Sequence, residues 1–284
     1  MNSFKEKAAH GIFAVAAAIT VFTVALICFF LFAGGMPGMM KIGVWQFVSG
    51  SHWKPTQEIF GILPMILGSV YVTAGALVIG VPAGLLTALY LSRFATPKVK
   101  RFLKPTVSLL AGIPSVVYGF WGLTTIVPAI RVFFGGSGSC LLAAALLLGI
   151  MILPTIAAVS EAALNAVPSS YYEGALALGA THERAVFTVI LRAARSGVIA
   201  SIILGIGRAI GEAMAVMMVA GNRAVIPNSL IKGVRTLTAN IVMEMGYAAD
   251  LHRDALVATG VVLFVFILVI NALFSFYSRK AVQQ

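Results

Sequence analysis

Charged side chains are scarce in this sequence: they make up 10% of its 284 residues, and only nine residues are acidic. A soluble domain of ordinary composition carries about a quarter charged residues. By contrast, 60% of the residues are hydrophobic, and the mean hydropathy is +1.00. Several apolar runs exceed the roughly 18 residues that mark a membrane span. The composition therefore excludes a soluble protein and predicts an all-α, polytopic membrane protein.

The residues needed for most enzyme and metal sites are also few. The two cysteines, Cys28 and Cys140, lie in or beside apolar runs, and the four histidines are scattered without a metal-ligand spacing. This pattern excludes a disulfide framework and gives no metal site. The glycine-rich phosphate loop of ATP-binding enzymes is missing as well. We assign no catalytic residue, so if the protein moves a solute uphill, the energy comes from elsewhere.

The formal net charge is +11, because Lys and Arg together number 20. A strongly basic soluble protein suggests a nucleic-acid partner. The interleaved basic and aromatic residues of such a surface are absent here, so we expect no nucleic acid. The basic residues instead lie mostly in short loops between apolar runs, where they determine membrane orientation.

Six apolar runs are long enough to span a membrane. They cover about residues 11–33, 62–91, 107–130, 139–163, 196–221 and 255–276. The first is longer than the apolar core of a signal peptide and lacks a small-residue cleavage site, so we expect it to be retained. The expected organisation is a segment 1–60, with a cytoplasmic start, the first span and an external loop, followed by a membrane domain over 61–277.

The distribution of basic residues predicts that both termini are cytoplasmic. With six spans and the N-terminus inside, cytoplasmic segments hold 12 Lys and Arg residues, and external segments hold seven. Five of the twelve lie within residues 93–104, which is the strongest positive-inside signal in the chain. The segment between the fourth and fifth spans then faces the cytoplasm.

Two charges interrupt the fifth run, Arg208 and Glu212. Residues four apart share one face of a helix, and a charge at the bilayer centre costs about 2.5–3.5 kcal/mol on insertion scales. The pair is either a structural ion pair between helices or a polar constriction on a transport path. Arginine keeps its charge and matches oxyanions geometrically, so a path would favour an anion. The third run is broken over residues 112–115 by Gly112 and Pro114, and Ser115 in this break either offers a hydroxyl to that path or lies at a simple kink.

A short polar-edged segment separates the fourth and fifth runs. Ser170 followed by Glu173 has the spacing of a capping box at a helix N-terminus, and Gly179 suits a left-handed stop. We expect a helix over 170–179, with Thr181 capping the next one. A helix this short is marginal by itself, so another part of the chain or another protein has to hold it.

This segment resembles the cytoplasmic signature of ABC importer permeases. The matching residues are Glu173, Gly174, Ala175, Gly179 and, after nine intervening residues, Val189-Ile190-Leu191. The family form reads Glu-Ala-Ala, three residues, Gly, nine residues, Ile, any residue, Leu-Pro, and this chain departs from it at Gly174 and Arg192. The resemblance implies that residues 170–179 form a coupling helix that docks on an ATP-hydrolysing subunit.

Other stretches resemble the PstC-type permease of the bacterial phosphate importer. They are residues 60–64, 112–119, 151–155, 208–212 and 235–241, and the resemblance extends over about residues 55–276. It implies the transmembrane domain of a type I ABC importer, with Arg208 and Glu212 on the phosphate path. Ala213 stands where the family motif has Thr.

The resemblance also implies the rest of the complex. A PstA-like second permease subunit, two copies of an ABC ATPase subunit and an external phosphate-binding protein are the expected partners. ATP is then bound by the partner subunit, so this chain needs no cofactor and is not an enzyme. The expected function is ATP-driven import of inorganic phosphate across the bacterial cytoplasmic membrane. Three alternatives stay open: a permease for another oxyanion such as phosphonate, sulfate or molybdate, an ATP-independent channel or carrier, and a membrane sensor without transport.

Overall fold

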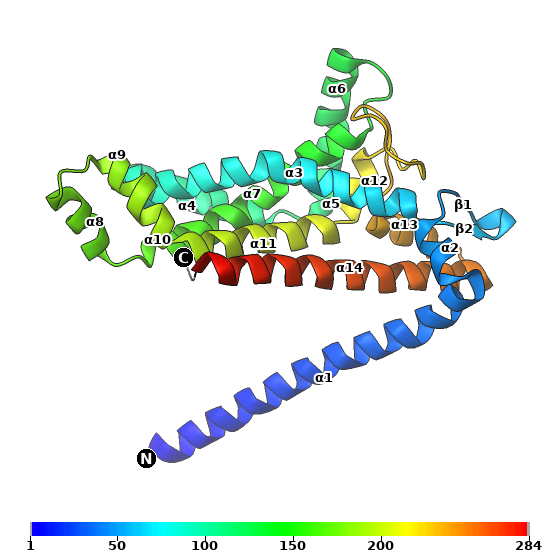
Figure 1. Cartoon of the computed structure of the whole chain (residues 1–284), viewed down its shortest axis with the longest axis horizontal. Helices are drawn as coiled ribbons and strands as arrows, with labels where there is room; N and C mark the ends of the chain where they lie inside the picture. The colour runs from blue at the N-terminus through cyan, green and yellow to red at the C-terminus, as the bar shows by residue number, and fades with distance from the viewer. Residues whose placement is uncertain (1, 283–284) are drawn as a thin grey trace.

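The computed structural model describes residues 2–282 (Figure 1). The side chains of residues 2–8, 274–275 and 277–282 lie outside the described set. They include Lys5, Lys7, Arg279 and Lys280, which were counted in the orientation argument. The described chain is helical apart from one two-stranded sheet and the connecting loops.

The elements follow one another from the N-terminus to the C-terminus. They are α1 (Asn2–Ile42), α2 (Val44–Ser49), β1 (Trp53–Lys54), β2 (Ile59–Phe60), α3 (Leu63–Leu89), α4 (Pro97–Gly112), α5 (Ser115–Trp121), α6 (Val127–Phe134), α7 (Leu141–Asn165), α8 (Ser169–Ala177), α9 (His182–Arg184), α10 (Leu191–Ala193), α11 (Arg195–Gly211), α12 (Met214–Val219), α13 (Leu237–Glu244) and α14 (Asp250–Val282). Three π-helical segments extend or join these helices at Tyr90–Phe94, Gly122–Ile126 and Ala185–Ile190.

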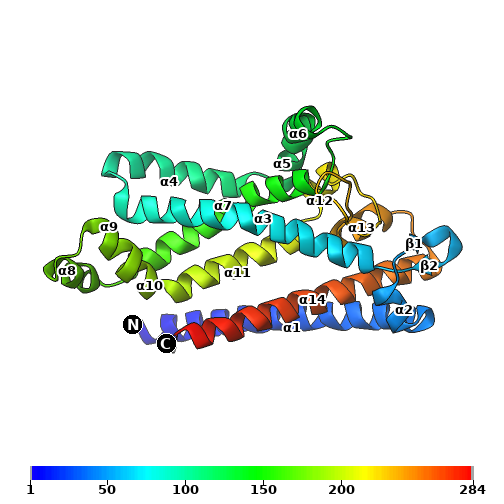
Figure 2. The same cartoon turned by 45° about the horizontal axis from the view of Figure 1, so that its top comes forward.

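Helices α3, α7 and α11 form the core of the bundle (Figures 1 and 2). α3 and α7 approach closely because glycine, which has no side chain, lies at their contact. A Cβ added to Gly80 would lie 2.6 Å from Ile152 Cγ1. α11 also packs against α7, where a Cβ added to Gly205 of α11 would lie 3.0 Å from Ile156 Cδ1 of α7. Small residues of this kind allow membrane helices to make dense van der Waals contact.

The structure confirms the all-helical membrane fold. By length and apolar composition, the described residues contain five candidate spans, which are Ala9–Ile42, Leu63–Phe94, Ser115–Phe134, Leu141–Asn165 and Asp250–Leu273. A sixth is counted if His182–Ala193 and Arg195–Gly211, which meet at 70°, form one bent span. The start of α1 and the end of α14 lie at the end of the molecule that carries α8 (Figure 2).

The first span is longer than the sequence predicted. α1 continues through residues 34–42, which we had assigned to an external loop because of their glycines and proline. The glycines serve close packing instead: a Cβ on Gly35 would lie 2.6 Å from Val261 Cγ2 in α14. Farther along, Lys41 Nζ lies 3.7 Å from the Asp254 carboxylate. The loop that follows the first span therefore begins only after α1.

The third span also differs from the prediction. The expected break over residues 112–115 is present, because α4 ends at Gly112 and α5 begins at Ser115. Residues 107–112, however, belong to the basic helix α4, and the candidate span covers Ser115–Phe134 instead of 107–130. The break separates two helices, whereas we had expected it inside one span.

A buried carboxylate holds α4 against α7. Glu161 of α7 is 3% exposed and accepts a hydrogen bond from Lys104 Nζ at 2.9 Å, while Lys100 Nζ lies 3.6 Å away. A buried carboxylate requires such partners. These ion pairs explain why a lysine-rich segment that looks like a loop in the sequence is a packed helix.

The end of the bundle opposite α8 is formed by the β1–β2 hairpin, α2, α13 and the start of α14 (Figure 1). The hairpin is antiparallel and pairs Trp53 with Phe60. Beneath it lies a separate hydrophobic cluster in which Phe47, Ile62 and Leu237 are fully buried. Segments far apart in the sequence thus form one packed unit at this end.

Candidate functional site

Arg208 lies in the part of α11 that is not covered by the rest of the chain. Its neighbours Ala209 and Ile210 are buried in the bundle. In contrast, a Cβ added to Gly207 or Gly211 would meet no atom within 4 Å. Arg208 itself is half-buried, and its Nε has no hydrogen-bond partner among the described residues. An unsatisfied buried donor costs free energy, so this position suits an anion or a group from another protein.

The prediction that Arg208 and Glu212 share one face of a helix is wrong. α11 ends at Gly211, and Glu212 has extended backbone angles, with φ −73° and ψ 120°. Its carboxylate Oε1 accepts a hydrogen bond from the Ala215 amide at 3.1 Å, at the start of α12. An acidic side chain is well placed to satisfy the free amides of a helix start. No ion pair joins Arg208 to Glu212 in the described part of the chain.

Helices α5 and α12 lie side by side beyond this break. A Cβ on Gly119 would lie 3.0 Å from Ala215 Cα, and one on Gly122 would lie 3.0 Å from Val219 Cγ1. Because the contacts follow the same order along both helices, the two helices run in the same direction. Both therefore begin at about the same level of the bundle, α5 after the break over residues 112–115 and α12 after the break at Glu212.

This arrangement brings Ser115 to the level of the α11–α12 break, since Ser115 is the first residue of α5. One turn farther along α5, Tyr118 lies within electrostatic range of Arg208 and donates a hydrogen bond to the Leu110 carbonyl at 2.9 Å. Among the described residues, no hydrogen bond joins Ser115 to Arg208 or to Glu212. The three predicted path residues therefore share a region of the fold without contacting one another.

The expected helix between the fourth and fifth spans is present as α8, but the predicted capping box is wrong. α8 starts at Ser169, and no side chain caps it. The Pro168 carbonyl instead accepts a hydrogen bond from the Tyr171 amide at 3.2 Å, which begins the helix one residue before Ser170. The left-handed stop is confirmed, because Gly179 has φ +83°. The second cap is confirmed as well: the Thr181 hydroxyl accepts a hydrogen bond from the Arg184 amide at 3.3 Å.

Most of α8 is not covered by the chain itself. Among the predicted coupling residues, Glu173 and Gly174 are exposed and Ala175 is buried. Leu178, at the end of the helix, is 91% exposed and lines a shallow groove of about 420 Å³ with Tyr171 and four other residues. Exposed apolar residues grouped around a groove are typical of a protein interface.

An aromatic cluster that the sequence did not reveal holds α8 in place. The Tyr172 hydroxyl lies 2.8 Å from His182 Nδ1. The His182 ring packs edge-on against Phe94, with 4.8 Å between ring centroids. The three residues come from α8, α9 and the π-helical segment after α3. They connect the candidate coupling helix directly to the second span.

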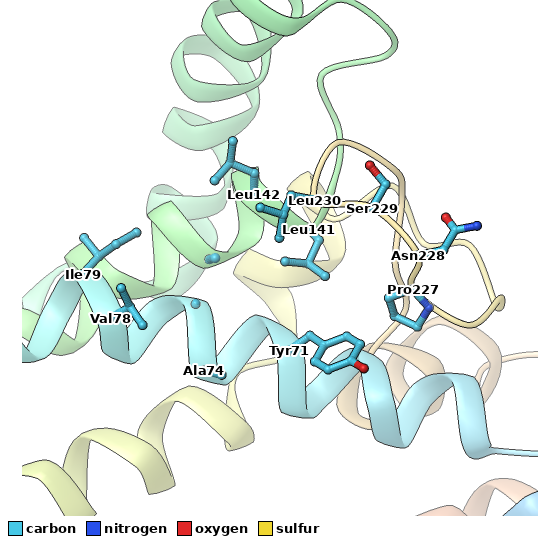
Figure 3. Close-up of a pocket in the computed structure, with 12 residues that line it drawn as sticks. Tyr71, Ala74, Val78, Ile79, Leu141, Leu142, Pro227, Asn228, Ser229 and Leu230 are labelled. Atoms are coloured by element: carbon cyan, nitrogen blue, oxygen red, sulfur yellow. The ribbon is translucent and has the colours of Figure 1, made fainter.

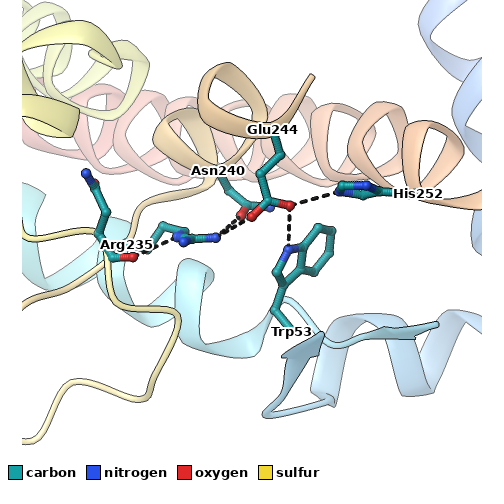
Figure 4. A network of polar contacts seen from close by, with 6 residues as sticks. Trp53, Arg235, Asn240, Glu244 and His252 are labelled. Atoms are coloured by element: carbon teal, nitrogen blue, oxygen red, sulfur yellow. Dashed lines mark hydrogen bonds and ion pairs between the residues drawn. The ribbon is translucent and has the colours of Figure 1, made fainter. Parts of the chain in front are cut away.

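A buried polar network at the opposite end was also missed (Figure 4). Glu244 Oε1 pairs with an Arg235 guanidinium nitrogen at 2.6 Å. Its other oxygen accepts a hydrogen bond from Trp53 Nε1 at 2.8 Å and lies 2.9 Å from His252 Nε2. Arg235 also donates to Asn240 Oδ1 at 3.0 Å. The motif over residues 235–241 was the only signal of this network in the sequence.

An apolar cavity of about 560 Å³ lies between α3, α7 and the loop over residues 227–230 (Figure 3). Tyr71, Val78 and Leu142 are among the residues that line it, and Asn228 and Ser229 lie at its edge (Figure 3). It has no charged lining residue. The cavity is therefore unsuited to an anion and is separate from the region of Arg208.

Comparison with known proteins gives a family match over residues 80–283. The matching family is described as the binding-protein-dependent transport system inner membrane component. The chain is 40% identical over 260 residues to a probable ABC transporter permease protein, YqgH of Bacillus subtilis, covering 88% of this chain and 84% of that protein. It is 34% identical over 285 residues to the phosphate transport system permease protein PstC of Mesorhizobium japonicum, covering 93% and 87% of the two chains.

A solved structure supports the same fold. The crystal structure of a bacterial ABC transporter involved in the import of the acidic polysaccharide alginate matches with a TM-score of 0.61. The match covers 93% of this chain and 95% of that chain, at 14% sequence identity. At this identity the likeness concerns the helical architecture alone.

Proposed function

Because the chain belongs to the family of inner membrane components of binding-protein-dependent transport systems, we propose that it is the permease subunit through which an ATP-driven importer moves inorganic phosphate. As a member of this family it is a multi-pass protein of the inner membrane. The membrane component of an ABC transporter does not hydrolyse ATP, so this chain is not an enzyme and needs no cofactor.

The observation that carries the choice of an anion is the environment of Arg208. Its guanidinium remains charged at all physiological pH values and presents a planar set of donors that matches phosphate oxygens. The buried Nε lacks a partner among the described residues, and α11 has open space beside it at Gly207 and Gly211. A passing phosphate would satisfy this donor. Ser115 and Glu212 shape the same region, with Ser115 offering a hydroxyl.

Phosphate is favoured over other oxyanions by the relatives. The protein from Mesorhizobium japonicum that is 34% identical over most of this chain is named a phosphate transport permease. The printed name of the Bacillus subtilis relative specifies no substrate. Sulfate and molybdate are tetrahedral oxyanions like phosphate, and phosphonate keeps three of its four oxygens, so another oxyanion is one outcome of the test.

Phosphate import requires an energy source. Moving one negative charge against an inside-negative potential of 100 mV costs about 2.3 kcal/mol, and a doubly charged phosphate costs about twice that. A passive pore cannot concentrate such an ion. The exposed α8 helix supplies the contact for the ATPase, with Glu173, Gly174, Ala175 and Gly179 in the coupling segment. The mechanism would be alternating access, in which ATPase closure moves α8 and opens the Arg208 region outward.

The complex we propose contains a PstA-like second permease subunit, two copies of an ABC ATPase and an external phosphate-binding protein. The open part of α11 around Gly207 and Gly211 is where a second permease would complete the path. We propose that both termini are cytoplasmic. This proposal is supported by the 12 to seven excess of basic residues in the segments assigned to the cytoplasm, and the start of α1 and the end of α14 lie at the same end of the molecule as α8 (Figure 2).

The test is uptake of labelled phosphate and labelled sulfate by the complete complex in proteoliposomes, with and without ATP. We expect ATP-dependent phosphate uptake that exceeds sulfate uptake. Arg208→Ala should lower phosphate uptake by at least about 30-fold, the effect of about 2 kcal/mol for truncating a charged contact. Arg208→Lys should be intermediate because it keeps the charge and loses the planar donors.

Arg101→Ala is the matched control, because Arg101 is an exposed arginine of α4 away from the path. It should leave uptake unchanged. Preferential sulfate uptake would indicate another oxyanion, and equal uptake without ATP would indicate a channel or carrier. Normal uptake by Arg208→Ala would remove Arg208 from the path.

A further inference from the structure

The segment Val234–Thr238 contacts α12, the short helix that follows the break at Glu212. It leads into and includes the first residues of α13, at the end of the bundle that carries the β hairpin (Figures 1 and 4). Its sequence belongs to the motif over residues 235–241, to which the transport path gives no role. The contacts of this segment show what it does.

The first contact is made at the start of α12. Thr238 Oγ1 donates a hydrogen bond to the Glu212 carbonyl at 3.0 Å, and the Glu212 carboxylate in turn caps α12 at the Ala215 amide. The Thr238 hydroxyl also lies 3.1 Å from that of Thr236, which accepts a hydrogen bond from the Ala239 amide at the start of α13. The start of α13 therefore fixes the break in the fifth span.

The second contact is made at the other end of α12. The Val234 amide donates to the Ala220 carbonyl at 2.9 Å. Arg235 Nε donates to the Asn222 carbonyl at 3.0 Å, and Asn222 Nδ2 donates to the Met217 carbonyl at 2.7 Å. One short segment thus holds α12 at both ends.

Glu244 connects this segment to the outer loops. Its side chain is 7% exposed and binds Arg235 with one oxygen, and Trp53 and His252 with the other. Trp53 belongs to the β hairpin and His252 to the start of α14. The rings of Phe60 and His252 stack with 6.0 Å between centroids. The Glu244 carboxylate therefore connects both outer segments to Arg235.

We propose that Thr238 and Glu244 are positioning residues that couple the outer loops, through α13 and α12, to the polar break beside Arg208. A soluble binding protein that docks on the outer loops would then bias the transport path without contacting it. This inference rests on the proposed function in requiring an importer with an external binding protein. It does not depend on which anion is carried.

The test uses the complete complex in proteoliposomes and measures ATP hydrolysis with and without loaded binding protein. Thr238→Val removes the hydroxyl that bonds the Glu212 carbonyl and keeps the size of the side chain. Glu244→Gln weakens the pairing with Arg235. Each variant should lower the ratio of stimulated to basal ATPase activity by about fivefold or more, the lower range of allosteric coupling. Basal activity should stay unchanged, and the double variant should lose no more than the stronger single variant.

Thr259→Val is the matched control. Thr259 is fully buried in α14, and its hydroxyl bonds only the Ala255 carbonyl of its own helix. This variant should keep the full stimulation. If Glu244→Gln fails to fold, Thr238→Val alone tests the proposal, because Thr238→Val leaves the charged network around Glu244 intact.

The proposal is overturned if Thr238→Val keeps full stimulation. It is also overturned if stimulated and basal activities fall in proportion, since that result describes a purely structural role. A wild-type complex that the binding protein does not stimulate would overturn it as well. Stimulation that persists while phosphate uptake is absent would overturn only the choice of phosphate.

Discussion

The two ends of the molecule are completed in different ways. At the end that carries the β hairpin, α13 contributes Leu237, Asn240 and Glu244 to a buried unit, and the Glu244 carboxylate has three partners within the chain. At the end that carries α8, this helix buries only Ala175 among its residues. A buried ionic group has to be satisfied by its own protein, whereas exposed apolar residues around a groove are typical of an interface. The hairpin end is therefore completed by intramolecular contacts, whereas the α8 end has an uncovered surface on which we propose that a partner docks.

The largest expected difference between the two ends concerns stability. Glu244→Ala leaves the Arg235 guanidinium buried without its carboxylate, and breaking a buried pair in this way costs about 3–5 kcal/mol. Glu173→Ala in exposed α8 should change the free energy of unfolding by less than about 0.5 kcal/mol. Denaturant unfolding of both variants in detergent measures the two values.

Transport measurements should distinguish the same two variants in a different way from unfolding. Glu173→Ala should lower ATP-driven uptake although its stability is unchanged, because Glu173 lies in the coupling segment. Equal losses of stability in the two variants would show that the Glu173 side chain is held by contacts within this chain.

The second prediction concerns Leu178, which is 91% exposed at the end of α8. Leu178→Ser should weaken association with the ATPase subunit by about 30-fold if Leu178 is a central apolar anchor, since such residues contribute about 2 kcal/mol or more. Leu230→Ser is the control, because Leu230 is 60% exposed in the loop at the outer end. A pull-down titration of the ATPase with each variant gives the comparison, and equal affinities would contradict an α8 interface.

Sequence reasoning succeeded where one short stretch contains the whole cause. Long apolar runs predicted the spans because a bilayer accepts little else. Gly112 and Pro114 predicted the break before α5, and Gly179 predicted the end of the α8 region because few other residues accept a positive φ.

Sequence reasoning failed where a residue far away in the sequence determines the local structure. Gly35 looked like part of a loop, but it is a packing residue because α14 lies against it. Lys100 looked like a loop residue, but it is helical because Glu161 is buried beside it. Glu212 lies outside the helix of Arg208 because its carboxylate caps α12.

The outer network was beyond prediction for a related reason. Trp53 and Glu244 are 191 residues apart in the sequence, and no periodicity or spacing connects residues that far apart. Only the folded chain brings the hairpin and α13 together.

The third prediction compares two glycines of the coupling segment. Gly179 has φ +83°, and Gly179→Ala should destabilise the end of α8 by about 1–2 kcal/mol because an L-residue is strained there. Gly174 lies inside α8 with no atom within 4 Å of an added Cβ. Gly174→Ala should therefore stabilise the helix by up to about 1 kcal/mol. Hydrogen exchange of the α8 amides in the isolated subunit measures both, and changes of the same sign would contradict the assigned conformations.

The smallest expected effect concerns the connection between α8 and the second span. Tyr172→Phe removes the hydroxyl that lies 2.8 Å from His182 Nδ1 and keeps the ring. The loss of one such hydrogen bond should destabilise the local contact by about 1 kcal/mol, which is seen as faster proteolysis between α8 and α9. Tyr171→Phe is the control, because the Tyr171 hydroxyl forms no hydrogen bond within the described chain and its side chain is exposed. If both variants are cut at the wild-type rate, the Tyr172–His182 contact does not hold α8, and the α8 end differs from the hairpin end even more than the contacts within the chain indicate.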